Sequence, residues 1–169
     1  RAGRDNTSAS NNVCIGEAAG QDRTTGASNV NIGNLSNYTG NGSHNVSVGF
    51  YALSTNPASN NTAVGSNALR YINNTNGGGN VGVGRQTGIS VTSGANNTLL
   101  GYQAGASGTN NLTTGSNNII LGYNAAASAA TVSNEITLGD ANISHFRIPG
   151  IGVSFSEGGG VVTGIMTAS

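Results

Sequence analysis

The sequence predicts an all-β protein, a parallel β-solenoid of about eight coils with a short C-terminal cap. Three observations lead to this prediction. A short apolar segment that ends in glycine recurs eight times, its residues alternate with a period of two, and Asn and Gly crowd the stretches between segments. Period-two alternation is typical of strands, and a regular spacing near 16 residues is typical of successive coils.

One glycine in each unit sets the register of the repeat. The residue before it is always aliphatic, and a β-branched residue lies two positions earlier, as β-strands favour. We therefore expect each coil to hold two short strands, the first with its aliphatic side chains buried, and a bend at the glycine. The glycines are Gly16, Gly33, Gly49, Gly65, Gly84, Gly101, Gly122 and Gly139.

A column of asparagines precedes the predicted strands. Stacked Asn side chains can hydrogen-bond one another along a solenoid and satisfy backbone groups of the turns, so a structural role is favoured over a ligand role. Glu135 takes this position in the last unit, where the stack would end. The members of the column are Asn12, Asn29, Asn45, Asn61, Asn80, Asn97 and Asn118.

The repeats divide the chain into three parts. Residues 1–9 form an N-terminal lead-in, residues 10–144 the solenoid, and residues 145–169 a cap or a transition to another module, because the repeat stops there. Two units are longer than the others, at residues 70–79 and 105–115, and are expected to bulge outward as loops. Loops on a regular scaffold are frequent binding sites.

The composition excludes several classes of protein. Six Arg balance six acids and there is no Lys, so the chain lacks the basic surface that nucleic acid requires. No apolar run is long enough for insertion into a membrane. Cys14 is the only cysteine, which excludes a disulfide framework and a cysteine zinc site. We expect neither a cofactor nor a metal.

The sequence also argues against an enzyme. His44 and His145 are the only histidines, and neither has the spacing of a Ser, His and acid arrangement. A hexapeptide-type acyltransferase is the remaining enzyme alternative, since Val64–Leu69 fits one hexad, but successive hexads do not follow. An ice-binding solenoid would need a regular threonine array, and the Thr residues are irregularly placed.

Each coil has few apolar residues, which favours an oligomer. A thin roll with so little core gains stability if some apolar side chains pack against neighbouring chains. The residues expected to do so are Phe50, Leu53, Leu69, Tyr102 and Tyr123.

Over residues 10–143 the units, such as "NTAVG" at 61–65, resemble the head repeats of YadA-like trimeric autotransporter adhesins. The segments "NNTLLGYQAG" and "SNEITLGDANISHFRIPG" (133–150) more closely resemble phage tail fibres that carry the same repeats. The resemblance implies a left-handed β-roll, a homotrimer, and a structural role in a virion tail fibre beside other tail proteins. It also implies recognition of a glycan or protein on the host surface. A bacterial adhesin head is the alternative.

Exposed loop side chains are the candidates for receptor contact. Aromatic and Arg side chains suit sugar and protein interfaces, although solvated loop residues or packing between chains would account for the same side chains. The candidates are Arg70, Tyr71, Asn73 and Asn74, followed by Tyr38 and Arg85.

Overall fold

The computed structural model describes residues 1–148, except 23, 56, 74 and 109, and the backbone of 153–156 and 159–162. It contains two compact units, Arg1–Gly139 and Asp140–Ser169. The described part of the chain contains strands and turns, and no helix. We describe each unit by itself.

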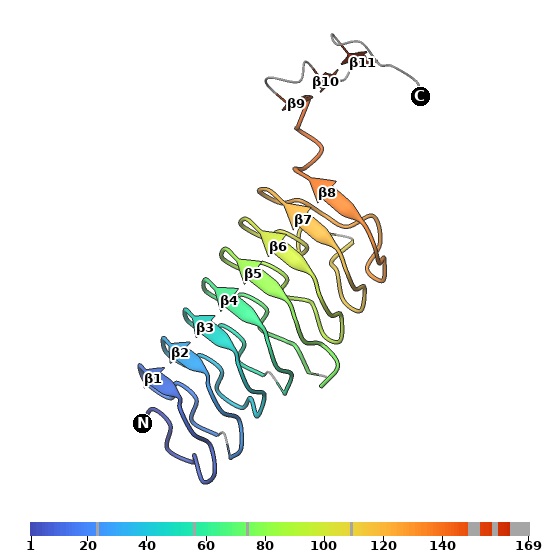
Figure 1. Ribbon diagram of the computed structural model, residues 1–169. Helices are drawn as coiled ribbons and strands as arrows, with labels where there is room; N and C mark the ends of the chain where they lie inside the picture. The colour runs from blue at the N-terminus through green and yellow to red at the C-terminus, as the bar shows by residue number, and fades with distance from the viewer. Residues whose placement is uncertain are drawn as a thin grey trace. The chain divides into compact units, whose positions relative to one another are not determined.

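The first unit is a β-solenoid of about seven turns, and its eight strands stack in chain order (Figure 1). Neighbouring strands pair in parallel, and each residue lies beside its counterpart in the next coil. The strands are β1 (Val13–Ile15), β2 (Val30–Ile32), β3 (Val46–Val48), β4 (Thr62–Val64), β5 (Val81–Val83), β6 (Thr98–Leu100), β7 (Ile119–Leu121) and β8 (Ile136–Leu138).

Each coil holds one strand, so the prediction of two strands per coil is wrong. The remainder of the coil consists of turns, in which alternate residues such as Tyr51 (φ 56°) and Leu53 (φ 49°) have positive φ. An extended strand cannot include such residues. The turns nevertheless bond to neighbouring coils, as the Tyr51 N–H does to the Asn34 carbonyl (3.1 Å) and the Leu53 N–H to the Ala68 carbonyl (3.1 Å).

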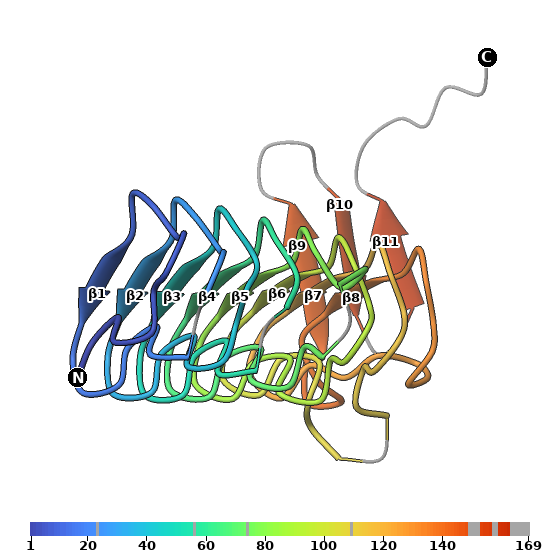
Figure 2. The ribbon, with the colours of Figure 1, turned by 90° about the horizontal axis from the view of Figure 1, so that it is seen from below.

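The first and third side chains of each strand, nearly all aliphatic, lie on the outside of the coil, not on the buried side that the sequence predicts. In β6, Thr98 and Leu100 are exposed while Leu99 between them is fully buried, and the same order holds from β2 to β7. The first and third residues of β1 to β8 form what we call the outer face. It runs along the whole sheet, which Figure 2 shows from another side.

The interior of the coils is filled by complementary large and small residues. A Cβ at Gly82 would lie 2.7 Å from Leu69 Cγ, and one at Gly88 would lie 2.7 Å from Leu69 Cδ2, so these glycines make room for the leucine. Leu53 and Leu69 are both fully buried here. They therefore do not pack against neighbouring chains, which corrects that prediction for these two residues.

The glycine column forms a close contact between neighbouring coils. Gly65 has a φ of 134°, and a Cβ there would lie 2.5 Å from the carbonyl oxygen of Gly84 in the next coil. The other column glycines up to Gly101 also face the carbonyl oxygen of the next glycine. Only glycine has both this backbone conformation and the space for this approach.

The second unit contains a three-stranded antiparallel sheet in the order β11-β10-β9. Its strands are β9 (His145–Ile148), β10 (Val153–Ser156) and β11 (Gly159–Val162). The change from parallel to antiparallel pairing follows the end of the repeat. Pro149, which interrupts the sequence pattern, lies outside the described residues.

Candidate functional site

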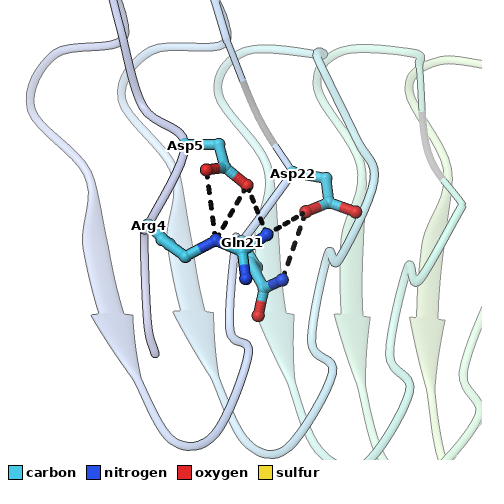
Figure 3. Close-up of polar contacts among 4 residues, drawn as sticks. All are labelled: Arg4, Asp5, Gln21 and Asp22. Atoms are coloured by element: carbon cyan, nitrogen blue, oxygen red, sulfur yellow. Dashed lines mark hydrogen bonds and ion pairs between the residues drawn. The ribbon is translucent and has the colours of Figure 1, made fainter.

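Three charged side chains near the N-terminal end, those of Arg4, Asp5 and Asp22, interact with one another. Arg4 donates to Asp5 (Nη2 to Oδ2, 2.9 Å) and lies 3.7 Å from Asp22, which also accepts from Gln21 at 3.3 Å (Figure 3). The hydrogen bond from Arg4 lowers the pKa of Asp5 below its ordinary value. All three charged side chains are substantially exposed. This cluster joins residues 1–9 to the next coil and has the character of a surface ion-pair network.

The candidate Tyr38 belongs to the same acidic neighbourhood. A hydrogen bond to Asp22 is the main cause that raises the pKa of Tyr38 above its ordinary value. The side chain is half-buried and lies two coils away from the coil of Arg70. The structure therefore separates Tyr38 from the other candidates.

Arg70 stands at the centre of the strongest cluster among the candidates. Its guanidinium carbon lies 4.1 Å from the ring centroid of Tyr51 and 4.9 Å from that of Tyr71. Its Nη1 donates to Asn67 Oδ1 at 2.9 Å. Phe50 adds an edge-to-face contact with Tyr51, at a centroid distance of 4.4 Å. Because the rings hold the cation in place, its remaining N–H groups are oriented for a further acceptor.

The loop at residues 70–79 is anchored at its base. Ile72 is fully buried in the core, while Tyr71 and Asn73 on either side of it are exposed. The second long unit is anchored in the same way by the fully buried Leu112. Both loops thus contribute a side chain to the core. The candidate Asn74 lies outside the described residues.

Arg85 belongs to a second cluster, on the coil after that of Arg70. It donates to the Tyr102 hydroxyl (3.0 Å) and to Gln86 Oε1 (3.2 Å). The Tyr102 ring stacks on Tyr123, with a centroid distance of 5.5 Å and an interplanar angle of 14°. Both tyrosines are among the residues that the sequence predicts to pack between chains. Both tyrosines and Arg85 directly follow a column glycine, and this shared position is the sequence signal for the cluster.

The asparagine column forms a hydrogen-bond ladder along the solenoid. In every step from Asn12 to Asn118, the side-chain oxygen accepts the backbone N–H of the next member at 2.8–3.0 Å. The side-chain amides donate mostly to turn carbonyls, as Asn97 does to Gly115 (2.9 Å). From Asn29 to Asn118 the members are buried. These contacts use the polar atoms of the column for the fold.

Glu135 ends the ladder and makes stability depend on pH. Its N–H bonds to Asn118 Oδ1, and its carboxylate accepts from the Ser128 N–H (2.9 Å) and the Thr137 hydroxyl (3.0 Å). The bonds from Ser128 are the main cause that lowers the pKa of Glu135 below its ordinary value near 4.5. A lowered folded pKa contributes stability that is present above the unfolded pKa and is lost as the pH falls through the folded value.

We therefore expect Glu135→Gln to be less stable than the parent chain at pH 7, and this difference to shrink as the pH falls through the folded pKa of Glu135. Melting temperatures of both chains, measured from pH 7 to pH 3, test this. A difference that stays constant over the range would contradict the assignment. Asp140→Asn, which removes an acid for which no ladder bond is found, serves as the control.

The described residues contain no group of three or more His, Cys, Asp or Glu that could hold a metal ion. Cys14 is free and half-buried, and its sulfur lies 3.5 Å from the side-chain nitrogen of Asn31. In the same part of the chain, no helix is long and apolar enough to cross a membrane.

The outer face is an apolar surface that runs from β1 to β8 of the first unit. It comprises fourteen aliphatic residues and two threonines and carries no charge. Leu100 is 49% exposed and Ile136 is 67% exposed. Contiguous apolar surfaces of this kind mark interaction sites in soluble proteins.

The fold, the glycine column, the asparagine ladder and the outer face define a β-solenoid repeat protein whose sheet has one exposed apolar face. Comparison of the chain with known protein families, with curated proteins and with solved structures gives no match.

Proposed function

We propose that this chain is a segment of a phage tail fibre, a non-catalytic homotrimeric rod that displays surface side chains to the host cell. In this proposal the solenoid is a left-handed β-roll and residues 145–169 cap it. The segment joins other tail proteins in the virion and contacts a glycan or protein on the host surface. The observation that carries the proposal is the uncovered, uncharged outer face.

A second and a third copy of the same chain are the occupants that fit this face. The face repeats with every coil and runs from β1 to β8, so a partner must offer a regular apolar surface of equal length. Another copy offers such a surface without any unpaired charge. Closed rotational symmetry lets three copies cover one another's faces around a common axis.

The trimer predicts a clear result for Leu100→Glu. Leu100 is half-exposed in the single chain, so the substitution is compatible with folding, but it would bury a carboxylate in the trimer. Light scattering is expected to give a mass near three times 16.7 kDa for the parent chain and near 16.7 kDa for the variant. Asn110→Glu, on an exposed loop, adds the same charge and is expected to leave the mass unchanged.

A folded parent chain with a mass of 16.7 kDa would overturn the trimer. A mass corresponding to two copies would assign the outer face to a dimer, and would also contradict the proposed rod.

The virion location needs a separate experiment, because a bacterial adhesin head would also be a trimer. Mass spectrometry of purified virions and of bacterial outer-membrane fractions is expected to find the chain in virions. Its presence in the outer membrane alone would favour the adhesin and overturn the tail-fibre proposal.

A further inference from the structure

Two adjacent columns run along the solenoid after the glycine column. They contain the two residues that follow each column glycine, and backbone hydrogen bonds join them from coil to coil, for example from Asn67 N to Phe50 O (2.8 Å) and from Gln103 N to Arg85 O (3.0 Å). We call the large side chains on and beside these columns the strip. Its members are Phe50, Tyr51, Arg70, Arg85, Tyr102 and Tyr123.

The two arginines of the strip are held in place but are not neutralised. Both lie over tyrosine rings, and among the described residues their side-chain hydrogen bonds go to the neutral groups of Asn67, Gln86 and Tyr102. Among the described residues, the ion pairs formed by side chains involve Arg4, not these two. A guanidinium fixed by a ring and carrying no counter-charge favours a carboxylate or another anion as its next partner.

The charge pattern of the sequence agrees with this. No Asp or Glu lies between Asp22 and Glu135, whereas both arginines of the strip lie within that interval. The middle coils therefore carry positive charge without any acid of their own. Such a surface attracts anions over short range and loses this attraction as salt is added.

The tyrosines add a second recognition element. Tyr123 is 64% exposed and ends the stack that begins with Arg85 and Tyr102, so one face of its ring is free for a ligand in the single chain. Amide side chains line the same columns, where Gln103 donates to Gln86 at 3.1 Å. Ring faces pack against the C–H groups of sugars, and amides bond to sugar hydroxyls.

The strip extends over neighbouring coils, which in a parallel sheet lie about 4.8 Å apart. An extended polymer lying along the solenoid could therefore contact several coils at once. Nucleic acid is disfavoured, because two arginines cannot neutralise a phosphate backbone. A sugar chain that carries carboxylates matches the arginines, the rings and the amides together.

We propose that the strip binds a carboxylated polysaccharide, with Arg70 and Arg85 bonding to its carboxylates and Tyr123 packing on a sugar ring. This inference rests on the proposed function, because it names the chemistry of the receptor.

The test is to measure the binding of the full chain to polygalacturonate by calorimetry at low salt. Arg85→Gln is expected to weaken binding at least about tenfold, because it removes a charge-assisted hydrogen bond. Tyr123→Ala is expected to weaken it several-fold. Arg147→Gln removes an exposed charge from β9, outside the strip, and is expected to change binding less than about twofold. Neutral dextran is expected not to bind.

Three results would overturn the inference: no binding of polygalacturonate, equal weakening by Arg85→Gln and Arg147→Gln, or a loss of binding that accompanies a change in oligomeric mass. The last would show that the strip is covered by a neighbouring chain. Tight binding of dextran sulfate that is insensitive to Tyr123→Ala would show that the strip is a non-specific cationic surface. This result would overturn the inference as well.

These outcomes are separable from the fate of the fibre proposal. A trimer found in virions that ignores polygalacturonate would keep the fibre and reject the strip. A monomer, or an outer-membrane protein, that binds polygalacturonate through Arg85 would keep the strip and reject the fibre.

Discussion

Gly65→Ala is expected to reduce the free energy of unfolding by about 4 kcal/mol. The alanine Cβ would lie 2.5 Å from the Gly84 carbonyl oxygen, so the backbone of one coil must move. Overpacking of this kind costs about 1–3 kcal/mol, and the unfavourable φ of 134° adds about 1–3 kcal/mol. Urea unfolding followed by circular dichroism, at a fixed chain concentration, measures the difference.

Gly108→Ala is the matched control. Its φ of 93° is also unfavourable for alanine, but no atom lies within 4 Å of the added Cβ. The free energy of unfolding of this variant is expected to fall by only about 1 kcal/mol, the cost of the unfavourable backbone conformation. Similar losses in the two variants would mean that the stacking of glycine on glycine contributes little.

Asn80→Ala is expected to cost about 3 kcal/mol. The fully buried Asn80 side chain accepts the N–H of Asn97 and donates to the carbonyls of Gly77 (2.8 Å) and Gly94 (2.9 Å). Alanine leaves these groups without that partner in the interior, and each unsatisfied group costs about 1–3 kcal/mol, with partial relaxation. The same unfolding experiment gives the value.

Asn110→Ala tests whether burial accounts for this effect. Asn110 is exposed and makes one side-chain bond, to the Ser128 carbonyl at 2.9 Å. Its loss is expected to cost less than about 0.5 kcal/mol. If both variants lost equal stability, the ladder would not be a special source of stability.

The positions of the strands and of the glycine and asparagine columns could be predicted from the sequence, because they depend on residues that recur in register. The Gly column and the Asn column fix where each coil begins and ends. The second strand was wrongly predicted because Leu35 and Tyr51 have positive φ, which L-residues rarely adopt and composition does not reveal.

The orientation of the strands could not be read from alternation alone. A period of two shows that the two sides differ, and the residue type was used to choose the buried side. Here the central residue faces inward whether it is Asn31, Ala63 or Leu99, since its neighbours in the coil adjust to its size and polarity. The aliphatic side chains at the first and third positions of the strands consequently lie outside.

The candidate site was predictable only where it is local in sequence. Arg70 and Tyr71 are adjacent, so their contact follows from the chain itself. Tyr51 reaches Arg70 from the preceding coil, and Tyr102 reaches Arg85 from the following one. Such contacts depend on the lengths of the intervening turns, which the sequence pattern does not specify.

The connection of each coil only to its neighbours has a mechanical consequence for a rod under tension. The bonds between coils lie along the axis, so pulling on the ends of a single chain opens one junction at a time. Each opened coil, of sixteen to twenty-one residues, releases about 55–75 Å of extended chain. The solenoid therefore lengthens in steps under load. The chain released by the first coil to open lowers the tension on the coils that remain closed.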